Sequence, residues 1–242
     1  MKKCAELGEI YCIFSHSGVK YRCDDLNERW DRRDPTKKQK SDRKVAKNEV
    51  YRMIKELLYE NRTCRTFDES RKITREELLD MVDCARVTPA AMNVQPLSYR
   101  LVYTAEELEK FQPLTKWGGA LPELNLPPVG HRPQAFIVIC QDTEKFGDAG
   151  KFDRDVGICA MAIYMRAAEM GLSGCMIGAF NRPAAKEVLG LPENVEPLLT
   201  IGLGKADEVR KIVPVKDGVT RYYREDGVHC VPKRDLSDIV ID

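Results

Sequence analysis

The stretch that most constrains the fold of this chain is an unbroken apolar run, Ala-Phe-Ile-Val-Ile-Cys, over residues 135–140. A strand with one face in water alternates apolar and polar residues, whereas a strand that is apolar at every position is covered on both faces. We therefore predict a central strand here, in a sheet covered by helices. The longest helical pattern, over residues 153–170, is apolar around much of its circumference and is also expected to be central, with Gly171 as its C-terminal cap.

Shorter patterns predict the other elements. A helix is expected over residues 45–60, and Thr74 with Glu77 forms a capping box that starts a helix reaching about residue 85. The further elements are a strand over 99–103, a helix over 105–117, strands over 173–180 and 197–204, and a helix beginning at Pro183. This order predicts an α/β or α+β sheet covered by helices.

Three segments resist such assignment. The Pro-rich segment over residues 118–133 is long for a loop in a compact domain, and such loops are often lids or active-site walls. Residues 205–227 are polar and show no clear pattern. The tail from residue 228 has apolar positions with little local material to pack on, so we expect it to dock on a neighbouring surface, such as another subunit.

Size and composition exclude several classes of protein. The 242 residues allow one substantial core, or one domain with an extension. A formal net charge of +1 argues against a strongly basic nucleic-acid-binding protein. Nine cysteines without a C-x-x-C pair do not make a secreted disulfide scaffold, so we expect the reducing cytoplasm. No apolar run approaches the roughly 20 residues of a membrane span.

Residues 1–48 differ from the rest of the chain. They predict a flexible or weakly helical N-terminal extension, followed by a main domain over residues 49–242. Cys4, Cys12 and His16, with Cys23, match no zinc-binding spacing, and we expect no metal site.

Two side-chain amides lie one residue apart in the segment that we call the amide loop, residues 88–96. Pro89 and Pro96 bound its centre, and neither can donate a backbone hydrogen bond. An amide offers donors and an acceptor in one plane, so Asn93 and Gln95 could recognise a flat ring that alternates donors and acceptors. A simple surface turn explains the same residues.

Two basic clusters could hold an anion. Arg62 and Arg65, with Thr63 between them, lie in what we call the basic segment, residues 61–67, and Lys233 with Arg234 forms the second cluster. Guanidinium groups match phosphate in a bidentate geometry. Each cluster alone is more often a solvated charged surface, but with the paired amides they supply a phosphate end and a planar-ring end, as a flavin nucleotide requires.

Other chemistries find less support. The arginines beside Cys64 could lower the pKa of its thiol, although a small residue packed in a basic link is the favoured interpretation. Gly202 and Gly204 end a predicted strand but lack the third glycine and the helix of a dinucleotide fingerprint. The three histidines accompany no G-x-S-x-G motif, so a hydrolase is not indicated.

From about residue 53 to residue 242 the chain resembles the flavin-dependent nitroreductase family in four ordered motifs. Residues 62–67 resemble the R-[ST]-x-R-x-F motif of the family, and residues 89–96 resemble its P-S-x-x-N-x-Q-P segment. Residues 155–157 and 171–180 resemble the long central helix and the flavin-facing strand after it, and residues 231–236 resemble the basic C-terminal motif. One such motif would be weak, whereas four in order are a strong signal.

The resemblance implies an α+β sandwich with a central, mostly antiparallel sheet, which forms a homodimer that binds FMN at the subunit interface and docks its C-terminal arm on the partner. It implies that the phosphate and the electron-poor ring edge are held by Arg62, Thr63, Arg65, Lys233 and Arg234. It further implies that the flavin is also contacted by Pro89, Ala90, Asn93 and Gln95, with backbone at Ile177, Gly178 and Ala179 near its reactive edge.

Two residues depart from the family pattern. Asn61 stands where many members carry a further arginine, and Ala90 replaces the serine of the P-S pair. These differences concern single contacts to the flavin. Arg65 is the candidate for stabilising negative charge that develops at the pyrimidine edge of the ring.

The implied function is an NAD(P)H-dependent FMN oxidoreductase that acts by a ping-pong mechanism on nitroaromatics, quinones or similar small acceptors. NADH and NADPH stay open, because no clamp for a 2′-phosphate can be placed. One alternative is a flavin-binding or sensor protein without turnover. Another is a specialised flavin dehydrogenase or dehalogenase on the same fold.

Overall fold

The computed structural model describes residues 11–12, 21–22 and 54–241. The chain divides into two units, Met1–Tyr51 and Arg52–Asp242. In the first unit, β1 (Tyr11–Cys12) pairs antiparallel with β2 (Tyr21–Arg22).

Several sequence predictions fall outside the described residues. They include most of the N-terminal extension over residues 1–48, the boundary at residue 49 and the first part of the helix predicted over residues 45–60. Cys4, His16 and Cys23 lie there too. The described part of that helix is α3 (Ile54–Glu60).

The sheet of the second unit has β5 (Ala135–Asp142) at its centre, where the apolar run predicts a strand. One edge of β5 pairs with β4 (Leu97–Val102), and the other edge pairs with the long strand β7 (Val195–Ala206). Along the far edge of β7 lie β6 (Ser173–Ile177) and β3 (Phe67–Asp68). All of these pairings are antiparallel, which confirms the predicted antiparallel sheet of an α+β fold.

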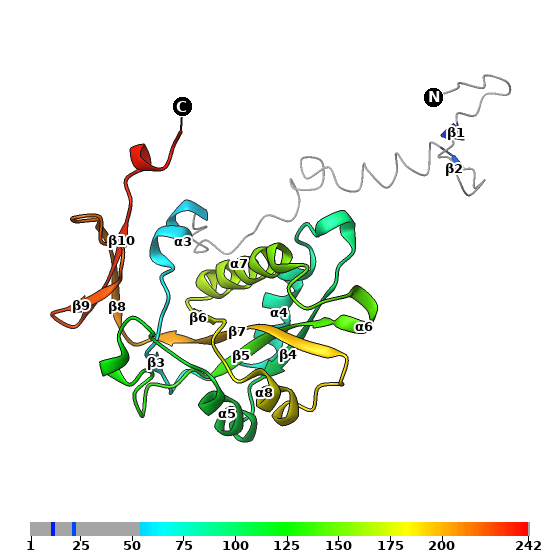
Figure 1. The fold of residues 1–242 in the computed structure, drawn as a ribbon, viewed down its shortest axis with the longest axis horizontal. Helices are drawn as coiled ribbons and strands as arrows, with labels where there is room; N and C mark the ends of the chain where they lie inside the picture. Colours follow the sequence, from blue (N-terminus) through cyan, green and yellow to red (C-terminus); the bar gives the residue numbers. More distant parts are fainter. Residues whose placement is uncertain (1–10, 13–20, 23–53, 242) are drawn as a thin grey trace, which may run out of the picture. The chain divides into compact units, whose positions relative to one another are not determined.

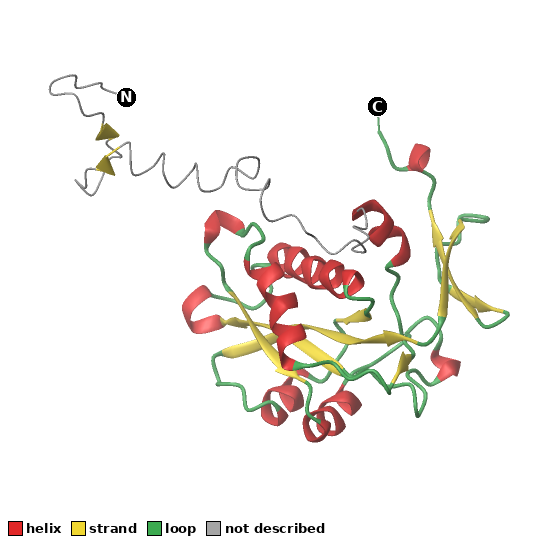
Figure 2. Cartoon of the chain, turned by 180° about the vertical axis from the view of Figure 1, so that it is seen from behind, coloured by secondary structure: helices red, strands yellow, loops and turns green. Residues whose placement is uncertain are grey.

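Helices cover both faces of this sheet (Figure 1). One face is covered by α4 (Arg75–Arg86) and α7 (Asp153–Glu169), and the other by α5 (Ala105–Phe111) and α8 (Arg182–Val188). Figure 2 shows the same layers from behind, with the sheet between the helices.

The residues of β5 alternate between the two layers. Ile137 and Ile139 belong to the core under α4 and α7, whereas Phe136 and Val138 belong to the core over α5 and α8. Because successive side chains of a strand point to opposite faces, a strand between two helix layers is apolar throughout. This arrangement explains the unbroken apolar run.

Local signals set most helix boundaries. Thr74 and Glu77 form the predicted capping box at the start of α4. α7 ends at Glu169, and Gly171 follows it with a φ of 73°, a left-handed conformation that glycine adopts without strain. The helix predicted over residues 105–117 is shorter, because Pro113 disfavours a continuing α-helix and the chain forms a 3₁₀ turn over Gln112–Leu114.

The remaining short helices connect the larger elements. They are the 3₁₀ turns Ala91–Asn93, Pro122–Leu124 and Leu236–Asp238, and α6 (Thr143–Phe146). The strand predicted over residues 173–180 ends earlier, at Ile177, and Phe180 forms an isolated bridge with Thr115.

A second, three-stranded sheet occupies the region that the sequence pattern left unassigned. It consists of β8 (Val209–Pro214), β9 (Tyr223–Glu225) and β10 (Val228–Lys233). β10 lies in the middle, parallel to β8 and antiparallel to β9. Figure 1 shows this C-terminal sheet beside the end of the main sheet that carries β3. Docking of the tail on a partner subunit stays a prediction.

The two glycines of the rejected dinucleotide fingerprint have a packing role in β7. A Cβ atom on Gly202 would lie 2.7 Å from the ring of Trp117, and one on Gly204 would lie 2.7 Å from the ring of Phe67. Glycine therefore lets these two aromatic rings approach the strand.

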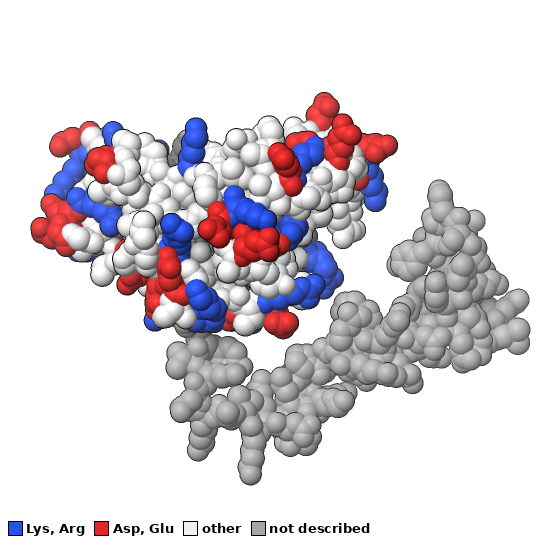
Figure 3. Space-filling view, turned by 90° about the horizontal axis from the view of Figure 1, so that it is seen from below, with Lys and Arg blue, Asp and Glu red and all other residues white. Residues whose placement is uncertain are grey.

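None of the described helices is both long and apolar enough to cross a membrane. Figure 3 views the second unit from below and shows positive and negative side chains interspersed on that face. An anion on this face would therefore contact a local cluster of positive side chains and not a broad basic surface.

Candidate functional site

The basic segment connects α3 to β3 and is bonded to two distant elements. The side-chain amide of Asn61 donates to the carbonyl oxygen of Tyr164 in α7, at 3.3 Å. The backbone N–H of Cys64 donates to the carbonyl oxygen of Gly174 in β6, at 2.8 Å. The fold therefore fixes this segment between the C-terminal half of α7 and the start of β6. Asn61 is buried against the helix.

Arg65 is enclosed by the C-terminal sheet. It is only 8% exposed, and its Nη1 atom lies 3.2 Å from Nε2 of His229. Its guanidinium carbon lies 4.4 Å from the centroid of the Tyr222 ring, a cation–π distance. The backbone N–H of Arg65 donates to Oε1 of Glu208 at 2.6 Å.

Glu208 connects the basic segment to the C-terminal sheet. Besides the N–H of Arg65, its carboxylate accepts a hydrogen bond from the guanidinium of Arg224. Nearby, Nη1 of Arg210 donates to the carbonyl oxygen of Arg62 at 2.6 Å. Burial and the positive charge of Arg210 lower the pKa of Arg62 from its usual value.

The guanidinium groups of the basic segment fit an anionic group. In the described part of the chain, the Nε atoms of Arg62 and Arg65 are buried without a hydrogen-bond partner. Among the described residues, no carboxylate forms an ion pair with either guanidinium. Buried donors normally have a partner, and guanidinium binds phosphate with strong charge-assisted bonds. A phosphate is therefore a suitable partner for this segment.

Cys64 is not an activated nucleophile. Burial, with the negative charge of Glu208, raises the pKa of its thiol to about 12. The thiol donates instead to the carbonyl oxygen of Thr66, at 3.0 Å. Packing, the favoured interpretation of this cysteine in the sequence, agrees with the structure.

The amide loop, in contrast to the basic segment, is mostly exposed. The side chains of Asn93 and Gln95 are exposed, and so is Pro89, while Ala90 is partly buried. Met92, Asn93 and Gln95 have φ values of 49°, 55° and 52°. Residues other than glycine seldom adopt this left-handed conformation, and it is costly where they do. A turn was one of the two interpretations of the sequence, and this one is strained.

α7 separates the amide loop from the basic segment. The loop contacts Asp155 in the first turn of α7, whereas Asn61 contacts Tyr164 nearer its end. Nine residues of α-helix span roughly 14 Å. Figure 1 shows the segment after α4 and the segment after α3 at opposite ends of α7. Within one chain, the structure does not bring these two halves of the predicted site together.

The other predicted contacts lie at two further places. Ile177 is buried at the end of β6, and Gly178 and Ala179 follow it exposed, with the carbonyl oxygen of Ala179 bound by the N–H of Lys116. Lys233 and Arg234 are exposed at the end of β10. Lys233 lies four residues beyond His229, which is roughly 13 Å along a strand.

The structure adds residues that the sequence did not indicate. Tyr222 accepts a hydrogen bond from the N–H of Ala120 at 3.2 Å, and Arg221 donates to the carbonyl oxygen of the same residue. The Pro-rich loop over residues 118–133 is thus tied to the ring that stacks on Arg65. No local pattern marks Tyr222, because Ala120, whose N–H donates to its hydroxyl, lies 102 positions away in the chain.

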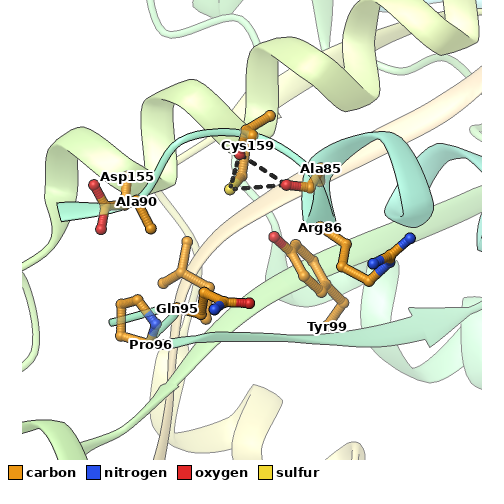
Figure 4. Close-up of a pocket in the computed structure, with 10 residues that line it drawn as sticks. Ala85, Arg86, Ala90, Gln95, Pro96, Tyr99, Asp155 and Cys159 are labelled. Atoms are coloured by element: carbon orange, nitrogen blue, oxygen red, sulfur yellow. Dashed lines mark hydrogen bonds between the residues drawn. The ribbon is translucent and has the colours of Figure 1, made fainter. Parts of the chain in front are cut away.

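A cavity of about 170 Å³ lies behind the amide loop (Figure 4). Its lining includes Ala90, Gln95, Tyr99, Asp155 and Cys159. Burial raises the pKa of the Tyr99 hydroxyl above its usual range. In the part of the chain that the structure describes, no group of three His, Cys, Asp or Glu side chains could hold a metal ion.

The fold and the site define an α+β protein with a helix-covered antiparallel sheet and an anion-binding segment. The model of the nitroreductase family matches residues 58–205, more than half of the chain. The chain therefore belongs to the nitroreductase family, which confirms the resemblance seen in the sequence.

Individual relatives agree with this assignment. An Archaeoglobus fulgidus protein with the provisional name NADH dehydrogenase/NAD(P)H nitroreductase is 27% identical over 157 residues, 61% of this chain and 82% of the relative. The structure of an FMN-dependent nitroreductase from Clostridium difficile aligns with a TM-score of 0.52 and 22% identity, covering 66% of this chain and 91% of that one. A provisionally named nitroreductase from Exiguobacterium sibiricum, solved with FMN, aligns with a TM-score of 0.54 and 18% identity over the same shares. These structures show the shared fold.

Proposed function

We propose that this chain forms a homodimeric, FMN-dependent oxidoreductase that takes hydride from NADH or NADPH and passes electrons to a small acceptor, such as a nitroaromatic or a quinone, in two successive half-reactions. The observation that carries the proposal is the pair of guanidinium groups of Arg62 and Arg65, whose buried Nε atoms have no hydrogen-bond partner among the described residues. Membership of the nitroreductase family supports it, as do the FMN-dependent and FMN-bound relatives of the same fold.

Different residues of the chain would hold different parts of the cofactor. Arg62, Thr63 and the exposed pair Lys233 and Arg234 would bind the phosphate, and Arg65 would stabilise negative charge at the pyrimidine edge of the ring. When bound, FMN supplies the chemistry by accepting hydride and passing on electrons.

The end of β6 would leave room for the reactive edge of the ring. Ile177 is buried there, and Gly178 and Ala179 are exposed. A Cβ atom added at Gly178 would meet nothing within 4 Å, so the backbone is open to a planar group.

A dimer would complete the site. The amide loop and the basic segment contact opposite ends of α7, so two copies related by a twofold axis across α7 would place each loop near the basic segment of the other chain. α3 and α7 lie on the same side of the sheet (Figure 1) and expose apolar side chains, including Ile54 at 66% and Ile158 at 43%. Such a surface is typical of an interface between subunits.

The direct test is an absorbance spectrum of the purified full-length protein, before and after addition of FMN and then of each nicotinamide under anaerobic conditions. We expect a yellow protein whose visible flavin band is bleached by NADH or NADPH and recovers when a quinone is added. A protein that stays colourless after FMN is added would contradict the proposal.

The buried position of Arg65 favours one second candidate. Because Tyr222 and His229 enclose Arg65, the chain could bind a flavin without promoting hydride transfer. Stopped-flow mixing separates the two functions. Rapid bleaching of the bound flavin by a nicotinamide supports the enzyme, whereas tight FMN binding without bleaching supports a flavin-binding or sensor protein.

A further inference from the structure

A buried carboxylate lies beneath the amide loop. Asp155 is the third residue of α7 and is only 5% exposed. Each of its carboxylate oxygens lies 3.3 Å from the backbone nitrogen of Ala91, which donates to them. Among the described residues, no Lys, Arg or His forms an ion pair with Asp155. Burying a carboxylate without a countercharge costs free energy, so its bond to the loop calls for an explanation.

The tip of the amide loop, residues 90–95, has little other support. It makes hydrogen bonds within itself, from Asn93 N–H to the Ala90 carbonyl and from Val94 N–H to the Ala91 carbonyl. The bond from Ala91 to Asp155 is the one hydrogen bond, among the described residues, that ties residues 90–95 to the rest of the fold.

Packing does not hold the tip either. Met92 is 92% exposed, and the cavity of about 170 Å³ lies behind the loop. Figure 4 shows Asp155 beside Ala90 on one side of this cavity, with Gln95 and Pro96 across from them. Three left-handed residues therefore persist in a loop that is neither packed nor composed of glycine.

We infer that Asp155 is a positioning residue for the flavin. Its carboxylate fixes the N–H of Ala91, and this contact holds the strained turn in the conformation that presents the amides of Asn93 and Gln95 outward. The inference rests on the proposed function, because the group that these amides receive is the flavin of the partner subunit's site. It assigns to Asp155 a role that neither its place in the first helical turn nor its charge indicates.

Two substitutions of Asp155 by residues with similarly branched side chains test whether the hydrogen-bond acceptor for the Ala91 N–H is what matters. Asp155→Asn keeps an oxygen that can accept the Ala91 N–H, whereas Asp155→Leu removes the acceptor, and the adjoining cavity has room for the larger side chain. Asp153→Asn is the matched control, because Asp153 lies in the same first turn of α7 but is exposed. Burying a carboxylate without a countercharge costs free energy, and a leucine side chain at this position would not carry that cost, so Asp155→Leu is expected to fold.

The experiment measures FMN affinity by titration of the flavin-free full-length protein, with the unfolding temperature of the same sample and hydrogen exchange at the Ala91 amide. We expect Asp155→Leu to bind FMN about tenfold more weakly, with faster exchange at Ala91 and no drop in unfolding temperature. Asp155→Asn should stay within about threefold of the unaltered chain and Asp153→Asn should match it. A merely structural role would lower the unfolding temperature and leave FMN affinity intact.

The outcomes separate this inference from the proposed function. If the unaltered chain binds no FMN, the proposed function fails and the positioning role fails with it. If the unaltered chain binds FMN and Asp155→Leu binds it equally well, the positioning role alone is overturned. Equal loss of affinity in Asp155→Asn and Asp155→Leu would also overturn it, because the acceptor would then not be what matters.

Discussion

The basic segment and the amide loop carry the two ends of the predicted flavin site, and they differ in burial and in the number of their contacts with the rest of the fold. The basic segment is largely buried and bonded to α7, β6 and the residue Glu208, which lies 143 positions from Arg65 in the chain. The tip of the amide loop, residues 90–95, is largely exposed, left-handed at three residues, and hydrogen-bonded to the rest of the described fold through Asp155. The anion-binding end is thus fixed by several tertiary contacts, and the tip of the ring-binding end by a single hydrogen bond to Asp155.

This difference bears on how a site of this kind is assembled. A preformed cluster of donors binds an anion without reorganisation, which favours affinity. A strained loop with exposed amides is stabilised by a partner that fills the space in front of it. The basic segment would then act as the fixed half of the site, and the amide loop as the half that a second chain completes.

The largest effect should come from removing the link between the basic segment and the C-terminal sheet. The side chain of Glu208 is 3% exposed and bonds both the N–H of Arg65 and the guanidinium of Arg224. Glu208→Ala leaves a largely buried arginine unpaired and should lower the free energy of unfolding by about 3–5 kcal/mol. Denaturant titration of the flavin-free protein measures this change.

The matched control for that variant is Glu225→Ala. Glu225 is an exposed acid on β9 of the same small sheet, and its loss should cost less than about 0.5 kcal/mol. Equal effects of the two variants would show that the basic segment does not depend on this buried contact.

Tyr222 offers a smaller test, because its ring and its hydroxyl have separate partners. Tyr222→Phe removes the bond from Ala120 and should cost about 1 kcal/mol of stability. Tyr222→Leu also removes the ring over Arg65, and the loss of this cation–π contact should lower stability by a further amount of roughly 0.5–2 kcal/mol. FMN affinity should change in Tyr222→Leu and not in Tyr222→Phe. Indistinguishable variants would mean that the ring does not position Arg65.

The pH dependence of stability tests the contact between Arg65 and His229. Burial, against the opposing charge of Glu208 and together with the positive charges of Arg65, Arg224 and Arg210, lowers the pKa of His229 below its ordinary 6.5. The unfolded chain therefore takes up a proton at higher pH than the folded chain does. Stability should be full above pH 6.5 and decrease as pH falls from there through the lower pKa of the folded state.

His229→Gln provides the comparison for this pH profile. Glutamine can still accept from Arg65 but does not titrate, so the loss of stability between about pH 6.5 and pH 5 should become smaller in the variant. Unfolding temperatures across this range measure it. An unchanged slope would show that another group controls the pH dependence.

The smallest effect on stability is expected in the amide loop. The side chains of Asn93 and Gln95 are exposed, so Asn93→Ala with Gln95→Ala should change the free energy of unfolding by less than about 0.5 kcal/mol. The same double variant should weaken FMN binding, because the amides serve the ring and not the fold. A large loss of stability would contradict the contrast between the two halves.

The sequence predicted those parts of the fold whose signals are local. The central strand over residues 135–140, the long helix α7 and the capping box at Thr74 follow from burial on two faces, helical periodicity and a short-range hydrogen-bond pattern. Helix length was overestimated after residue 111, where Pro113 prevents continuation.

The parts that the sequence did not predict depend on contacts between distant residues. The C-terminal sheet has short strands with weak alternation, so residues 205–227 showed no pattern. Arg65 meets His229 across 164 positions, and nothing near either residue indicates the pairing. Asp155 resembles an ordinary acid at a helix N-terminus, and only the structure shows its bond to the amide loop.

In the proposed dimer, one chain supplies the basic segment of each site and its partner supplies the amide loop. Complementation between two inactive variants tests it directly. One variant carries Arg62→Ala, and the other carries Asn93→Ala with Gln95→Ala. Each alone should bind FMN weakly, since both sites of its dimer are damaged.

Co-expression of the two variants with different affinity tags, followed by isolation of the doubly tagged dimer, gives the decisive sample. A site built from two chains leaves one intact site per mixed dimer, and we predict one tightly bound FMN per dimer. If the mixed dimer binds FMN no better than the separate variants do, each site lies within a single chain and the account is contradicted.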